Sequence, residues 1–170
     1  MKSIMPREKV FLLFIVFIMT SCNNPYSKDI SLLLDIDTAV VLNEKTIEDC
    51  AFCSEGVTIY KIKLDAKTIK RFVENETKQL PDNKDSSWCG YGWFTTPIEP
   101  CHKNVLNHLN YISRKSVERT LSEIQYILKE NDVYYAFYIR YFENDLDPLE
   151  AQIFVLNPHT EMLYIVVSIT

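Results

Sequence analysis

The order of the secondary-structure patterns predicts an α+β domain built on a small antiparallel sheet. Three apolar segments of strand-like composition follow one another at the C-terminus, at 133–142, 151–156 and 162–169. The connections between them are short and rich in turn residues, so we expect a three-strand antiparallel meander. Helical spacing occupies the middle of the chain, and we expect two or three helices to pack on one face of the sheet.

The N-terminal half contains one clear strand followed by one clear helix. Apolar and polar residues alternate over 57–64 with the period of two of a strand that is half-buried. A helix is expected directly afterwards because Asp65 is a favourable N-cap residue. Ile69, Phe72 and Val73 then form one apolar helical face, which we expect to pack on the sheet.

The remaining segments have weaker patterns. Residues 30–42 are rich in Leu, Val and Ile and are interpreted as one or two strands or an irregular core segment. Residues 79–100 contain three prolines and two glycines, which predicts a long loop. Helical spacing then runs over 105–128, either as two helices that break near Ser113 or as one bent helix.

The first 22 residues have the pattern of an export signal. Three basic residues precede an apolar run over 10–19, and small residues lead from this run to Cys22. A basic start, about ten apolar residues and small residues at the cleavage point are typical of a secretory signal. The run is also shorter than the roughly 20 residues that a membrane-spanning helix needs.

The segment 18–22, Ile-Met-Thr-Ser-Cys, resembles the lipobox of bacterial lipoproteins, with Met19 where the usual pattern has Leu. The resemblance covers only the signal sequence and Cys22. It implies that Cys22 is lipidated and becomes the first residue of the mature chain. The lipid implied by the resemblance has two or more acyl chains, which anchor a protein stably to a membrane. It divides the chain into three parts: a signal peptide at 1–21, a lipidated cysteine and tether at 22–29, and a single α+β domain at 30–170.

The resemblance also bears on location and partners. Asn23 and Asn24 follow the cysteine where inner-membrane retention would favour Asp, so by analogy with lipoprotein sorting we expect the outer membrane, facing the periplasm. The chain has a formal net charge of -5, which makes it a poor ligand for nucleic acid. We therefore expect a membrane contact through the lipid, an envelope protein as a candidate partner, and no nucleic acid.

The mature chain keeps four further cysteines once Cys22 is assigned to the lipid: Cys50, Cys53, Cys89 and Cys101. An even number in an exported protein predicts up to two disulfides, and the sequence leaves all three connectivities open. The alternative is a zinc site in which Cys50 and Cys53 have ligand spacing and the second couple is joined by His102. We favour disulfides because the envelope is oxidising, and we expect no metal and no other cofactor.

An aromatic segment within the predicted loop is the candidate binding surface. Its rings are those of Trp88, Tyr91, Trp93 and Phe94, and two glycines lie between them. Exposed rings offer flat faces to a sugar or to the side chains of a partner, and glycines permit close approach or positive φ. The alternative interpretation is that these rings cover the open end of the core.

Catalytic motifs are absent from the sequence, which has no Gly-x-Ser-x-Gly elbow, phosphate loop or His-Glu-x-x-His pair. The acidic run 143–150 lacks EF-hand spacing and is interpreted as a solvated turn. We therefore expect a non-catalytic, lipid-anchored binding or structural module, one form of which is an immunity or inhibitor lipoprotein. The alternative is an envelope-polymer hydrolase or glycan-binding protein that uses residues 88–94, with Asp35, Asp37 or Asp147 as acid and base.

Overall fold

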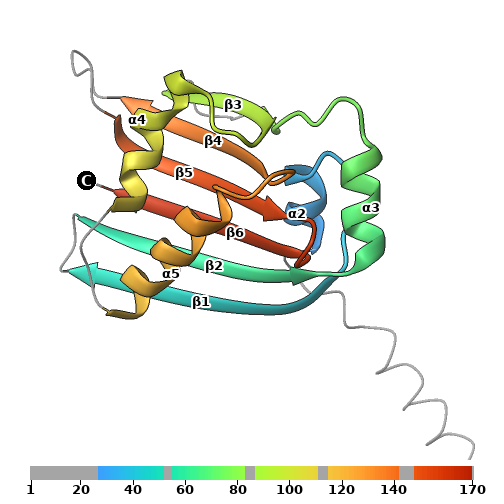
Figure 1. The fold of residues 1–170 in the computed structure, drawn as a ribbon, viewed down its shortest axis with the longest axis horizontal. Coiled ribbons are helices and arrows are strands. Elements are labelled where there is room, and N and C mark those ends of the chain that lie inside the picture. Colours follow the sequence, from blue (N-terminus) through green and yellow to red (C-terminus); the bar gives the residue numbers. More distant parts are fainter. Residues whose placement is uncertain (1–26, 52–54, 83–86, 111–114, 142–147, 170) are drawn as a thin grey trace, which may run out of the picture.

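The computed structural model describes residues 27–51, 55–82, 87–110, 115–141 and 148–169. Its centre is an antiparallel sheet with the strand order β1-β2-β6-β5-β4-β3 (Figure 1). The strands are β1 (Val41–Ala51), β2 (Glu55–Leu64), β3 (Trp88–Thr95), β4 (Tyr134–Tyr141), β5 (Pro148–Asn157) and β6 (Met162–Ile169). The predicted α+β class and the meander of β4, β5 and β6 are confirmed.

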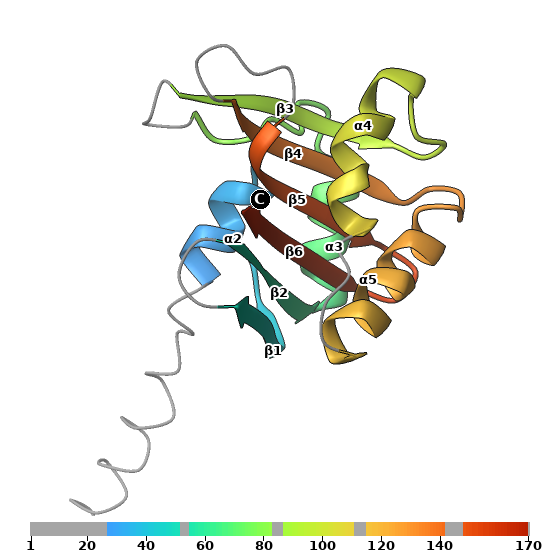
Figure 2. The same cartoon turned by 90° about the vertical axis from the view of Figure 1, so that its left-hand side faces the viewer.

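Helices lie on both faces of the sheet, whereas the sequence predicted helices on one face. The helical elements are α2 (Ser27–Leu33), α3 (Ala66–Glu74), η1 (Pro100–His102), α4 (Lys103–Leu106), η2 (Asn107–Asn110) and α5 (Lys115–Ile127). Figure 2 shows α4 and α5 on one side of the sheet and α2 on the other. The buried apolar residues form two clusters, one that includes Leu121 and Ile124 of α5 and one that includes Leu34 and Phe72 beside α2 and α3.

The sequence of β4 explains the second layer. Tyr135 and Phe137 belong to the cluster under α5, while Ala136 and Tyr138 between them belong to the cluster under α2 and α3. A strand that is apolar at consecutive positions is typical of a sheet covered on both sides. The continuous apolar run of this strand therefore corresponds to burial on both faces.

The segment after the predicted tether is a helix and not a strand. Residues 27–33 form α2, in which Ile30 and Leu33 are buried, and Leu34 in the following turn is buried as well. This spacing of three and four residues gives one apolar helical face. The folded domain therefore includes residues 27–29, which the sequence placed in the tether; the rest of the tether and Cys22 lie outside the described residues.

The predicted long loop contains the edge strand β3, which pairs with β4. The register shifts between Tyr91 and Phe94, so Gly92 and Trp93 together lie opposite one residue of β4. An extra residue of this kind is a β-bulge, which changes the face to which later side chains point. The glycines that suggested a loop are thus part of a bulged strand.

Helix α3 begins as predicted. Asp65 Oδ1 accepts a hydrogen bond of 2.8 Å from the backbone N–H of Thr68, which makes Asp65 the N-cap. Leu64 and Ile69, on either side of the cap, are buried in the same cluster. Val73, predicted to belong to the packed face, is 40% exposed, and the buried face of the helix consists of Thr68, Ile69 and Phe72.

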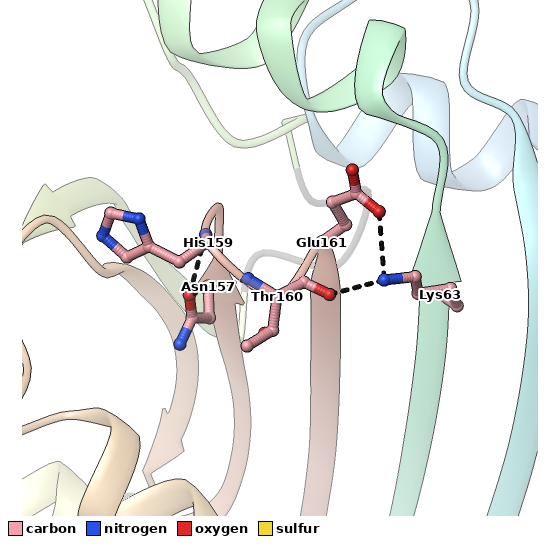
Figure 3. Close-up of polar contacts among 5 residues, drawn as sticks. All are labelled: Lys63, Asn157, His159, Thr160 and Glu161. Carbon is pink, nitrogen blue, oxygen red and sulfur yellow. Dashed lines mark hydrogen bonds and ion pairs between the residues drawn. The ribbon is translucent and has the colours of Figure 1, made fainter.

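Polar contacts close the turn between β5 and β6 (Figure 3). Asn157 Oδ1 accepts hydrogen bonds from the backbone N–H groups of His159 and Thr160, at 2.9 and 3.3 Å. Lys63 of β2 donates to the Thr160 carbonyl at 2.7 Å and forms an ion pair of 3.0 Å with Glu161. The imidazole of His159 points away from this ion pair (Figure 3).

Within the ranges that the structure describes, no helix is both long and apolar enough to cross a membrane.

Candidate functional site: a groove beside strand β3

A groove of about 620 Å³ lies between strand β3 and the segment 77–82 that precedes it. This volume is in the range of small-molecule sites, which is about 300–1,000 Å³. The residues that line it are Thr77, Lys78, Gln79, Leu80, Pro81, Asp82, Trp88, Gly90, Gly92, Trp93, Phe94 and Tyr138. The groove thus combines aromatic rings from the sheet with polar side chains from the adjoining segment.

The segment 77–82 forms the outer wall of the groove. It is held by hydrogen bonds to the Asp35 carboxylate. Thr77 Oγ1 donates to Asp35 Oδ2 at 2.6 Å, and the backbone N–H of Gln79 donates to the same oxygen at 3.4 Å. The bond from Thr77 is the main cause that lowers the pKa of Asp35 below its usual value, and a bond from Asn75 adds to it. Asp35 is therefore a structural carboxylate of this wall.

Asp35 and Asp37, two of the carboxylates considered for acid and base chemistry, do not lie on a strand. Both residues lie in the turn between α2 and β1, and Asp35 has a positive φ of 52°. A chain that reverses direction at these positions does not align the two side chains as a strand does. Asp147, the third carboxylate proposed for acid and base chemistry, lies outside the described residues.

Trp93 and Trp88 form the aromatic part of the groove. The Trp93 indole N–H donates to the Leu33 carbonyl at 3.1 Å, and its ring meets Phe72 edge to face at 5.0 Å between centroids. Trp93 is therefore fixed against the core, in agreement with the interpretation that the rings cover the core. Trp88 is only half-buried, and the guanidinium of Arg140 lies 5.5 Å from its ring centroid.

The Tyr138 ring lies between Gly90 and the aromatic core. Its hydroxyl donates to the Pro81 carbonyl, and its ring meets Phe154 edge to face. Burial raises the pKa of this phenol, and the charge of Asp82 adds to the increase. Tyr138 therefore stays neutral at physiological pH and connects the sheet to the outer wall.

The ammonium group of Lys78 is already engaged at the end of α3. It donates to the Val73 carbonyl at 3.0 Å and to the Asn75 carbonyl. Cations near the C-terminus of a helix are stabilised by its unpaired carbonyls. The ammonium group of Lys78 is thus directed to the helix end and not into the groove. Because this cation is already engaged, the groove is suited to a polar ligand with little net charge.

The two other predicted rings belong to the opposite face of the sheet. The Tyr91 ring stacks on Phe137 at 4.8 Å, and the Phe94 ring lies 4.4 Å from His102. The bulge at Gly92 and Trp93 explains why Phe94 returns to the face of Tyr91. The structure therefore brings Trp88 and Trp93 together in the groove and separates them from Tyr91. Phe94 also lines the groove, although its ring packs against His102 on the other side.

The predicted cysteine pairs are only partly described. Cys89 on β3 and Cys101 in η1 are free, exposed thiols, so the structure has no disulfide between them. The two lie on different elements separated by the turn at Thr96 and Pro97. The side chains of Cys50 and Cys53 lie outside the described residues, and their pairing stays a prediction.

The segment 77–82 was not identified as part of a site from the sequence. Its polar side chains and its proline are typical of any surface loop, and only their position beside β3 gives them a role. The chain matches no protein-family model, no curated protein and no solved structure.

Proposed function

We propose that this chain is a non-catalytic binding module of the cell envelope that holds an uncharged saccharide chain in the groove beside β3. The observation that carries the proposal is that the chain's two tryptophans, Trp88 and Trp93, line the same groove. Aromatic rings bury the apolar faces of a ligand, while a few polar groups fix its orientation. A sugar ring has both kinds of surface.

The groove chemistry supports a neutral polar ligand. Thr77, Gln79 and Asp82 place hydroxyl, amide and carboxylate groups along the outer wall, where they can exchange hydrogen bonds with sugar hydroxyls. Among the described residues that line the groove, the charged ones are Lys78 and Asp82, which have opposite signs. The described lining residues therefore offer no cluster of cations to a polyanion such as nucleic acid.

A binding role agrees better with the described carboxylates than hydrolysis does. Glycosidases use two carboxyl groups on either side of the scissile bond. Among the described residues, the groove is lined by one carboxylate, Asp82, while Asp35 is held by Thr77 and Gln79 in the outer wall. We therefore propose binding without turnover.

Tryptophan fluorescence tests the proposal directly because both emitting residues line the groove. Titration of the full-length chain with N-acetylglucosamine oligomers, which are uncharged, should change the emission in a saturable way. Trp88→Ala should weaken binding by at least about tenfold, since truncating a central aromatic anchor typically costs about 2 kcal/mol or more. Trp93 still reports on the groove in this variant.

Tyr126→Ala is the matched control. Tyr126 is 68% exposed on α5, on the face of the sheet away from the groove, so its removal should leave the affinity unchanged. Equal affinity in the Trp88→Ala protein would contradict the proposal. An emission that no saccharide changes, together with capture of one envelope protein by a photocrosslinker at position 88, would instead assign the groove to a protein partner.

The location at the outer membrane, facing the periplasm, is part of the proposal; it rests on Asn23 and Asn24, and the lipid anchor rests on Cys22. Replacing the thiol in Cys22→Ser removes the atom to which the lipid would be attached. We expect this variant to move from the membrane pellet to the soluble fraction, because acyl chains supply most of the membrane affinity of such an anchor. Persistence in the membrane pellet without detergent would argue against lipidation.

A further inference from the structure

A second group of chemically active side chains lies in the turn that precedes α4. One ligand atom each of Glu99, Cys101 and His102 lies within 4.8 Å of the other two. Cys101 Sγ is 3.7 Å from Glu99 Oε2. These residues are next to the cluster under α5, on the opposite face from the groove, so their chemistry is independent of the proposed saccharide binding.

The turn is closed by backbone and side-chain hydrogen bonds. The backbone N–H of His102 donates to the Glu99 carbonyl at 3.0 Å, which forms the tight turn of η1. The hydroxyl of buried Tyr135 accepts from the backbone N–H of Glu99 at 3.1 Å and lies 3.1 Å from His102 Nδ1. One phenol oxygen therefore holds both ends of the turn.

The imidazole of His102 is fixed while its two neighbours are accessible. His102 is 7% exposed, and its ring packs against Phe94 at 4.4 Å and Phe137 at 5.1 Å. Glu99 and Cys101 are exposed. A buried, hydrogen-bonded histidine beside an exposed thiol and carboxylate is a preorganised set of nitrogen, sulfur and oxygen donors.

We propose that Glu99, Cys101 and His102 bind a divalent transition-metal ion of the zinc class. In tetrahedral zinc sites the metal lies about 2.0–2.3 Å from its ligands, which places neighbouring ligand atoms about 3.5 Å apart. The separation of 3.7 Å between Cys101 Sγ and Glu99 Oε2 fits this geometry. Both exposed side chains can rotate to bring the remaining ligand distances into range.

The donor set also selects the metal. A thiolate and an imidazole favour Zn²⁺ or Co²⁺ over Mg²⁺ and Ca²⁺, which prefer oxygen ligands. Three protein ligands leave the fourth position of a tetrahedron to water or to a group from a partner. This set shares Cys101 and His102 with the zinc alternative considered from the sequence, but its third ligand is Glu99.

Cobalt binding tests the site because tetrahedral Co²⁺ absorbs visible light and a bound thiolate adds a charge-transfer band. The full-length chain, in detergent and reduced with a phosphine, is titrated with Co²⁺ alone. We expect saturation at one ion per chain and displacement by Zn²⁺. Cys101→Ser should abolish the charge-transfer band, and Glu99→Gln should weaken binding by at least about tenfold, a loss that even outer-shell changes can cause.

Two cysteine controls separate this site from the other thiols of the chain. Cys89→Ser removes the other described free thiol, and Cys50→Ser/Cys53→Ser removes the closely spaced pair. Both variants should keep the band and the affinity of the unmodified chain. The proposal is overturned if no band forms, if the band survives Cys101→Ser, or if either control variant loses it. Because Glu99 and Cys101 are exposed, their variants should fold, which circular dichroism will verify.

Discussion

Gly90 lies where strand β3 has no room for a side chain. A Cβ atom built on Gly90 would lie 2.8 Å from Tyr138 Cε1 and 3.0 Å from Cδ1. Real contacts of a Cβ atom are longer, so one of the two groups would have to move. The Tyr138 ring is restrained by Phe154 on one side and by the hydrogen bond to Pro81 at its end.

We expect Gly90→Ala to destabilise the protein by about 1–3 kcal/mol, the usual cost of forcing extra volume into a packed site. The measurement is equilibrium unfolding in urea at neutral pH. Since Tyr138 and Gly90 both line the groove, the same variant should also bind saccharide more weakly.

Gly92→Ala provides the comparison on the same strand. The nearest atom to a Cβ at Gly92 is the Lys78 carbonyl oxygen at 3.7 Å, an ordinary contact. Gly92 does not have the positive φ at which an L side chain is strained. This variant should be neutral or slightly stabilising, because alanine restricts the unfolded chain. If Gly92→Ala lowers the free energy of unfolding as much as Gly90→Ala does, the contact with Tyr138 is not the cause of the destabilisation. The loss of strand flexibility would then explain both results.

At the scale of elements, helix α3 and strand β2 were predictable from local rules. The start of α3 depends on the Asp65 cap, and β2 depends on the alternation of residue types over 57–64. Both are local patterns, formed by residues that are close in the sequence. Helix α2 was not predicted, because its Leu-rich segment also suits a strand. What decides between them is the packing of Ile30 and Leu34 beside α3, a contact between distant parts of the chain.

Strand β3 shows why the site could be predicted only in part. Composition identified Trp88 and Trp93 as candidate binding residues, and both line the groove. The glycines that indicated a loop instead allow the contact with Tyr138 and the bulge at Gly92. The bulge decides which rings face the groove, and the register of a strand relative to its partner cannot be predicted from the segment alone.

At the scale of the whole molecule, the two-sided sheet contains a group of tyrosines with displaced pKa values, most of which are buried or half-buried. Burial is the main cause that raises the pKa above the usual value of about 10 in each of them. Tyr164 is the most strongly affected; it is 1% exposed, and its hydroxyl donates to Glu123 Oε1 at 2.7 Å. The full set is Tyr134, Tyr135, Tyr138, Tyr141 and Tyr164.

These shifts predict that the domain loses stability at alkaline pH. A phenol with a raised pKa in the folded state gives its full contribution to stability below the unfolded pKa of about 10. Above this pH the unfolded chain releases the proton and the folded chain keeps it, so each such tyrosine can lower the free energy of unfolding by up to about 1.4 kcal/mol per pH unit. The contribution is lost as the pH rises towards the folded-state pKa.

Tyr164→Phe tests this dependence in one residue. At neutral pH we expect Tyr164→Phe to lower the free energy of unfolding by about 1–2 kcal/mol, because Glu123 loses a hydrogen-bond donor but keeps its ion pair with Lys61. Above pH 10 the free energy of unfolding should fall less steeply than in the unmodified chain, because one proton fewer is released on unfolding. Tyr126→Phe, at an exposed position of α5, should leave the free energy of unfolding at neutral pH unchanged. Urea unfolding measured in steps between pH 8 and 11 compares the three proteins, and an identical alkaline slope for Tyr164→Phe would show that Tyr164 is not the source of the pH dependence.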